Sequence, residues 1–230
     1  MTRAQYEAVE AYMHQCMQDS AHDREHVYRV LHTAFQIAET EPEADRDVLA
    51  CACLLHDIGR SEQFADPRLC HAMVGGDKAF RFLREQGFPE AFAQQVRGCI
   101  QSHRYRANNP PQTLEARILF DADKLDATGA MGIARTLLYA GQVSAPLYTR
   151  DASGGVSDGK DDTVPSFFRE YHFKLAKLYD RFYTRRGREL AMARREAAEH
   201  FYHAMLLEAR LSHAAGEAVL QTIFREQEVQ

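Results

Sequence analysis

The helix expected over residues 45–57 constrains the fold of this chain more than any other feature of the sequence. Its run DVLACACLLHD carries apolar side chains on every side, and such a helix is stable only when other elements surround it. The run ends in the adjacent pair His56 and Asp57, with Gly59 two positions later. A buried carboxylate is costly unless it is paired or bound to a cation. The sequence therefore predicts a central helix that ends at a cation site.

Apolar residues recur at helical spacing along nearly the whole chain. The β-like run ARILF at 116–120 is flanked by helical pattern on both sides and is absorbed into a helix. The predicted fold class is therefore all-α, a helical bundle. The expected helices cover residues 3–19, 24–40, 45–57, 68–86, 89–104, 114–127, 130–141, 166–184 and 187–226.

Residues 141–166 differ in kind from the rest, because they are rich in Gly, Ser and Asp and poor in apolar residues. A segment of this length is either disordered or a flap over a binding site. We expect a single domain over 1–230. Its core with the metal ligands lies at 1–140, followed by this flexible loop or flap and by C-terminal helices at 167–230 that pack back on the core.

Composition excludes several classes of partner. The net charge of the 230 residues is −5, and Lys and Arg are spread along the chain, which argues against a long nucleic acid. The longest apolar run, VLACACLL at 48–55, is far too short to span a bilayer. The five cysteines form no CxxC pair and are expected to be reduced core residues. We expect a cytoplasmic protein with no membrane partner.

Histidine and acidic side chains interrupt the apolar faces of several expected helices. His26 borders the apolar stripe of the helix at 24–40, and the run FDADKLD breaks an apolar helix at 120–126. Imidazole nitrogen and carboxylate oxygen together suit a divalent ion, so a shared metal site explains these residues better than separate accidents do. The ions expected are Mn²⁺, Fe²⁺, Co²⁺, Ni²⁺, Zn²⁺ or Mg²⁺.

The order of these residues makes the chain recognisable. His26, then His56-Asp57, then Asp123 reproduce the signature H…HD…D. The match extends over most of the chain through HDREHVYRVLHTA, CLLHDIGR, ILFDADKLDATGAMGIART and HFKLAKLYDRFYTRRGRELA. The chain resembles the HD superfamily of metal-dependent phosphohydrolases, and within it the YedJ/YpgQ-like bacterial subgroup. The resemblance implies an all-helical HD domain with a metal site at its centre.

The resemblance also decides between two HD dipeptides. His22-Asp23 precedes the helix at 24–40 and is expected to act at its start. The resemblance places the first metal ligand not in this dipeptide but at His26, in the run HVYRV. The metal ligands that the resemblance implies are His26, His56, Asp57 and Asp123.

Two further histidines leave the number of ions open. In HD enzymes with two ions, extra histidines follow the HD pair at roughly the places of His71 and His103. These two either complete a second metal site or, beside a single ion, support its ligands from behind or contact substrate. Asp126 lies about 60° around the helix from Asp123, so it either supports a ligand from behind or contacts substrate. Asp121 points away from Asp123 and is expected to be structural.

The chemistry that the resemblance implies is hydrolysis at phosphorus. A bound ion lowers the pKa of a coordinated water, and Asp57 serves as ligand and as base or orienting acceptor for that water. Phosphoryl oxygens need fixed positive partners in the transition state. Arg60 and Lys124 are the cations best placed for this role, and Arg135 and Lys174 are weaker candidates.

The expected function is therefore that of a metal-dependent phosphohydrolase acting on a small phosphorylated metabolite, with a nucleotide as the favoured substrate. One ion or two would serve as cofactor. Two alternatives stay open, a di-iron oxygenase on the HD scaffold and a non-catalytic, metal-containing nucleotide sensor. The long charged C-terminal helix could pair two copies, so a homodimer is an open prediction.

Overall fold

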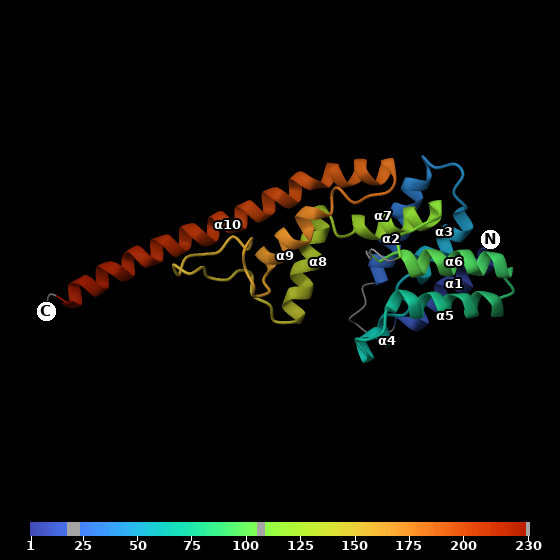
Figure 1. Cartoon of the computed structure of the whole chain (residues 1–230), viewed down its shortest axis with the longest axis horizontal. Coiled ribbons are helices and arrows are strands. Elements are labelled where there is room, and N and C mark those ends of the chain that lie inside the picture. The colour runs from blue at the N-terminus through green and yellow to red at the C-terminus, as the bar shows by residue number, and fades with distance from the viewer. Residues whose placement is uncertain (18–23, 105–108, 229–230) are drawn as a thin grey trace. The chain divides into compact units, whose positions relative to one another are not determined.

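The computed structural model describes residues 1–17, 24–104 and 109–228 of the chain. These residues form helices and connecting turns, and within them the only β-type pairing is an isolated bridge between Arg150 and Val156 (Figure 1). The predicted all-α fold class is confirmed. The helices are α1 (Arg3–Cys16), α2 (Arg24–Ala38), α3 (Arg46–Leu55), α4 (Arg60–Ala65), α5 (His71–Glu85), α6 (Glu90–Ser102), α7 (Leu114–Leu125), α8 (Gly129–Gln142), α9 (Phe167–Phe173), the 3₁₀ helix η1 (Leu175–Lys177) and α10 (Arg185–Glu228).

The chain forms two compact units. The first consists of Met1–Asp126 with Phe182–Leu190, and the second of Ala127–Arg181 with Ala191–Gln230. Helix α10 therefore begins in the first unit and continues in the second. The sequence suggested a different subdivision, at residue 140, and a single domain over the whole chain stays a prediction.

Helix α3 is the centre of the first unit, as its sequence predicts. Every residue from Val48 to Leu55 is buried, and the helix contacts α1, α2, α5, α6 and α7. Its N-terminus is fixed by Asp45, whose carboxylate accepts hydrogen bonds from the backbone N–H groups of Asp47 and Val48. The surrounding helices bury the all-apolar surface of α3 and bring the residues at its C-terminal end into the core.

The turn after α3 lies directly against the start of α5. A Cβ atom on Gly59 would lie 2.3 Å from the backbone oxygen of His71 and 2.6 Å from the backbone nitrogen of Gly75. Only glycine allows this approach, because the obstructing atoms are backbone and cannot rotate away. The short helix α4, which the sequence pattern did not predict, begins immediately after this glycine.

The helix expected over 166–184 is interrupted. Helix α9 ends at Phe173, η1 follows, and α10 begins only at Arg185. The reason for the new start is Asp121, a buried carboxylate that accepts hydrogen bonds from the backbone N–H groups of Tyr183 and Thr184. Because these N–H groups bond to a side chain, they are unavailable to a helix continuing from α9. This contact agrees with the structural role predicted for Asp121.

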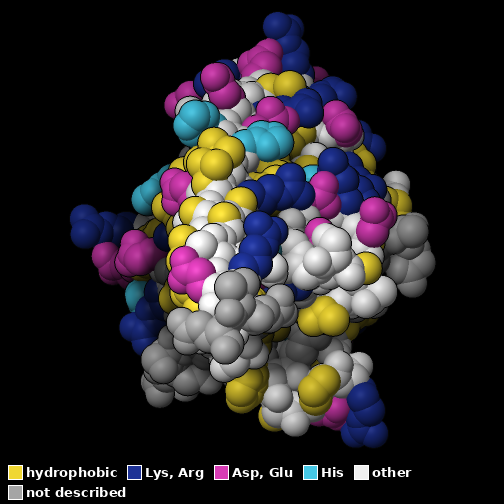
Figure 2. Space-filling model, turned by 90° about the vertical axis from the view of Figure 1, so that its left-hand side faces the viewer, with side chains coloured by type: hydrophobic (Ala, Val, Ile, Leu, Met, Phe, Trp, Pro, Cys, Tyr) yellow, Lys and Arg dark blue, Asp and Glu magenta, His cyan; other side chains and the backbone are white. Residues whose placement is uncertain are grey.

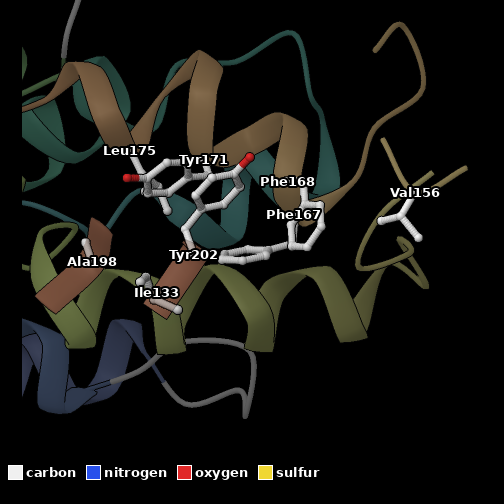
Figure 3. Close-up of a cluster of buried hydrophobic side chains, with 8 residues drawn as sticks. All are labelled: Ile133, Val156, Phe167, Phe168, Tyr171, Leu175, Ala198 and Tyr202. Atoms are coloured by element: carbon white, nitrogen blue, oxygen red, sulfur yellow. The ribbon is translucent and has the colours of Figure 1, made fainter. Parts of the chain in front are cut away.

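The second unit has a small aromatic core of its own (Figure 3). The rings of Tyr171 and Tyr202 stack with centroids 4.1 Å apart, and the hydroxyl of Tyr202 donates to the backbone oxygen of Asp158. That second contact ties α10 to the segment at 141–166, whose role as a flap stays a prediction. The cluster consists of Ile133, Val156, Phe167, Phe168, Tyr171, Leu175, Ala198 and Tyr202.

The surface carries charges of both signs. Figure 2 shows Lys and Arg side chains lying among Asp and Glu side chains on the face in view. Among the described residues, no helix has the length and apolar character needed to cross a bilayer. Three of the five cysteines, Cys51, Cys53 and Cys99, are buried, and all five are free thiols.

Candidate metal centre

Six side chains from five helices of the first unit converge in its interior. One comes from α2, two from the end of α3, one each from the start of α5 and the end of α6, and one from α7. Five are buried and the sixth, Asp123, is nearly so. The six are His26, His56, Asp57, His71, His103 and Asp123.

The first three donors form what we call the His26 group, which consists of His26, His56 and Asp123. The Nε2 atom of His26 lies 3.4 Å from Oδ1 of Asp123 and 3.4 Å from Nε2 of His56. All three donor atoms lie within 4.8 Å of one another, a spacing that could hold one metal ion.

The other three donors form the His71 group, which consists of Asp57, His71 and His103. Here the Nε2 atoms of the two histidines lie 3.3 Å apart. The donor atoms again lie within 4.8 Å of one another, so this group could hold a second ion.

Asp57 lies between the two groups. Its Oδ2 is 3.5 Å from Nε2 of His56 and 3.7 Å from Nε2 of His26, while its Oδ1 faces the His71 group, at 3.5 Å from Nε2 of His71. Oδ1 is buried and has no hydrogen-bond partner among the described residues. A buried carboxylate oxygen without a partner is the signature of a missing cation, so the donor set fits a metal ion.

All four imidazoles are held in the same way, through Nδ1. His26 donates to Asp126 at 2.7 Å, and His71 donates to Gln63 at 2.6 Å. The Nδ1 atoms of His56 and His103 donate to the backbone oxygens of Cys53 and Ile100, at 2.7 Å and 2.6 Å. Each hydrogen bond fixes the tautomer with the proton on Nδ1, so each Nε2 lone pair points to the centre as a metal ligand requires.

Burial sets the charge state of three histidines. It lowers the pKa of His56, lowers that of His71 to about 3, and lowers that of His103 to about 4. In His26 burial also lowers the pKa, but hydrogen bonds with Asp123 and Asp126 outweigh it and the net pKa is raised. Neutral imidazoles at pH 7 are the form that binds metals.

The carboxylates of the centre stay ionised despite their burial. Burial raises the pKa of Asp57, but the neighbouring His56 and Arg60 bring it well below the ordinary value. For Asp123, burial is outweighed by Lys124 and His26, so its pKa is also held well below the ordinary value. Both side chains are therefore anionic donors at neutral pH.

Two of the predicted cations reach the centre. Nε of Arg60 lies 2.6 Å from Oδ2 of Asp57, and Nζ of Lys124 lies 2.5 Å from Oδ2 of Asp123. The Arg60 side chain is 40 % exposed, so it also faces solvent. Arg135 and Lys174 belong to the second unit, where Lys174 pairs with Glu170, and their role toward the centre stays a prediction.

The structure adds three residues behind the histidines. Asp126, one of the predicted candidates, accepts from His26 and is held by Arg29, which the sequence analysis did not single out. Arg29 follows His26 by three residues on one helix face, and that spacing is the signal that could have found it. Gln63 gave no signal, because it lies on the unpredicted helix α4. The dipeptide His22-Asp23 lies outside the described residues.

We compared the chain with known protein families to find which of them share this arrangement of donors. Residues 24–128, which include all six donors, match the HD domain family. The matched range is less than half of the chain, and the match agrees with the resemblance to HD hydrolases that the sequence indicates.

Proteins similar to this chain cover most of its length. The protein YpgQ of Bacillus subtilis is 29% identical over 177 residues, which are 77% of this chain and 79% of YpgQ. The crystal structure of an HD-superfamily hydrolase from Bacillus thuringiensis is 29% identical, with a TM-score of 0.67, over 90% of this chain and 97% of that one. The structure of Bacillus subtilis YpgQ in complex with ADP is 26% identical, with a TM-score of 0.68, over 88% and 97%.

Proposed function

We propose that this protein is a metal-dependent phosphohydrolase that cleaves a phosphoester or phosphoanhydride bond in a small phosphorylated metabolite. The observation that carries the proposal is the position of Asp57. Its two oxygens face two groups of imidazole nitrogens, and one oxygen is buried without a hydrogen-bond partner in the part of the chain that the structure describes. A nucleotide is the favoured substrate, because relatives are described as HD-superfamily hydrolases and YpgQ binds ADP in its crystal structure.

Two groups of three donors support a pair of ions over a single one. Four imidazoles and two carboxylates favour Mn²⁺, Fe²⁺, Co²⁺, Ni²⁺ or Zn²⁺, whereas Mg²⁺ prefers a shell of oxygen ligands. When bound, such ions lower the pKa of a coordinated water and polarise the phosphoryl group. The residues that would hold them are His26, His56, Asp57, His71, His103 and Asp123.

The chain's own residues supply the other parts of the reaction. Asp57 would act as a ligand and also as the carboxylate that orients the attacking water and accepts its proton. Attack forms a new P–O bond and breaks the bond to the leaving oxygen, with charge developing on the phosphoryl oxygens. Arg60 and Lys124 lie beside the two carboxylates and provide fixed positive charge for those oxygens.

The test is hydrolysis by the metal-loaded full chain against a panel of nucleoside mono-, di- and triphosphates, measured as release of phosphate or pyrophosphate. We expect turnover with Mn²⁺ or Co²⁺. Asp57→Asn should lower kcat by about 10²–10⁴-fold, because it removes the negative charge at the centre and the group that can take a proton from water. Asp161→Asn is the matched control, since Asp161 is an exposed carboxylate of the second unit, whereas all six donors belong to the first.

Absence of turnover on the whole panel, with metal content verified and circular dichroism unchanged, would overturn the proposal and favour the non-catalytic sensor. The His-rich donor set with a carboxylate between its halves also suits paired iron, so a di-iron oxygenase is the second candidate. Oxygen consumption by the iron-loaded protein without phosphate release would select that alternative.

A further inference from the structure

The residues behind His26 and His71 differ in charge, although the two histidines occupy equivalent places in their groups. We propose that Asp126 and Gln63 are positioning residues which give the His26 group a higher affinity for a divalent ion than the His71 group. The inference rests on the metal centre of the proposed function and goes beyond it, because it assigns an order of filling to the two groups.

Asp126 is a buried carboxylate held from two sides. Its Oδ2 accepts the Nδ1–H of His26 at 2.7 Å, while Arg29 donates from Nε to Oδ1 at 2.7 Å and from Nη2 to Oδ2 at 3.0 Å. The two-pronged contact with the guanidinium fixes the plane of the carboxylate. A carboxylate behind a metal-binding imidazole orients the ring and makes its Nε2 a stronger donor.

Gln63 is a weaker support for His71. Its Oε1 accepts the Nδ1–H of His71 at 2.6 Å, so the tautomer is the same, but the amide is neutral. It lies on α4, a helix of six residues whose N-cap, Gly59, makes no side-chain hydrogen bond. On its Nδ1 side, His71 therefore has a neutral partner where His26 has a charged one.

The remaining histidines are matched in the two groups. His56 and His103 each follow the end of a helix and each donate Nδ1–H to the backbone oxygen three residues earlier. The carboxylates are not matched, because the His26 group contains Asp123 and also faces Oδ2 of Asp57, whereas the His71 group faces Oδ1 of Asp57 alone. This difference and the contrast between Asp126 and Gln63 both favour the His26 group, which is expected to fill first.

The decisive experiment is titration of the metal-free full chain with Mn²⁺. Binding is monitored by the electron paramagnetic resonance signal of the free ion and, separately, by calorimetry. The wild type should show two classes of site. Asp126→Asn should weaken the tight class by about 10–100-fold and leave the other within about threefold. Gln63→Ala should weaken only the loose class, and Gln63→Glu should tighten it by a comparable factor.

Two controls make the same chemical changes away from the centre. Asp161→Asn removes an exposed carboxylate of the second unit, and Gln86→Glu adds one at the exposed C-cap of α5. Neither control should change the Mn²⁺ affinity of either class of site. If circular dichroism shows that Asp126→Asn does not fold, the variants Gln63→Ala and Gln63→Glu still test the inference. A purely structural role for Gln63 would not make Gln63→Glu bind the ion more tightly.

The inference is overturned if only one Mn²⁺ binds or if Asp126→Asn weakens the Mn²⁺ affinity of both classes of site equally. It is also overturned if Gln63→Glu does not raise the affinity of the weaker class. These failures differ from failure of the proposed function. A protein with two unequal sites that hydrolyses nothing would contradict the function alone, whereas hydrolysis with unchanged affinities in the variants would contradict the inference alone.

Discussion

At the scale of single residues, the candidate metal centre contains four buried histidines fixed through Nδ1, and burial lowers the pKa of three of them, His56, His71 and His103. His71 and His103 illustrate the balance, because burial holds their pKa values at about 3 and about 4 while Asp57 lies beside both. An imidazole that cannot be protonated in the folded state keeps its lone pair available for an ion. The cost of this arrangement is a dependence of stability on pH.

The sign of that dependence follows from linkage. In the unfolded chain these histidines titrate near pH 6.5, so below that pH the unfolded state binds protons that the folded state does not. Their contribution to stability is fully present above about pH 6.5 and is lost as the pH falls toward the folded-state values of about 3 and about 4. Between pH 7 and pH 5, His71 and His103 should each lower the unfolding free energy of the metal-free protein by about 2 kcal/mol.

The measurement is urea unfolding of the chelator-treated protein at pH 7 and pH 5, in the wild type and in His103→Asn. The asparagine amide can still donate to the backbone oxygen of Ile100 but cannot be protonated, so the loss at pH 5 should shrink by about 2 kcal/mol. His32→Asn, at an exposed position, is the control and should leave the loss unchanged. An equal loss in the wild type and in His103→Asn would contradict the account.

At the scale of elements, the centre depends on how closely the turn after α3 approaches α5. Gly59 provides that approach, and it brings His71, the first residue of α5, to Asp57, the last of the HD pair. The sequence predicted a permissive glycine after the HD pair. It could not predict the contact itself, because the backbone of α5 that closes on Gly59 lies more than ten residues further along the chain.

Gly59→Ala should therefore destabilise the protein by about 3 kcal/mol or more, since the new methyl group meets backbone atoms that must move. The same substitution at Gly98, an exposed position inside α6 with nothing within 4 Å of its added Cβ, should stabilise by about 0.5–1 kcal/mol. Chemical denaturation of both variants tests the pair. If both substitutions changed the unfolding free energy equally, the close backbone approach at Gly59 would not contribute to stability.

The elements also show where sequence periodicity was sufficient and where it was not. It located α2, α3 and α6 within a few residues, because their apolar faces point into one core. It missed the break between α9 and α10, because the cause is Asp121, a carboxylate about sixty residues earlier that accepts from Tyr183 and Thr184. Local pattern contains no trace of such a distant partner.

At the scale of the whole molecule, every donor of the metal centre comes from the first unit, between His26 and Asp123. The ordered signature H…HD…D predicted four of these donors through a family resemblance, and the extra histidines His71 and His103 were predicted with two alternative roles. The supports Arg29 and Gln63 were not predicted, since each is a common surface residue until the fold places it behind an imidazole.

The most direct test of the account is the position of bound ions in the protein. Crystals of the full chain grown with Mn²⁺ should give anomalous difference peaks within about 2.3 Å of the Nε2 atoms of His26 and His56 and of the carboxylates of Asp57 and Asp123. We expect a second peak about 3.5–4 Å away, held by His71 and His103. Peaks confined to exposed acidic residues such as Asp151 and Asp161, with none at these donors, would contradict the central claim.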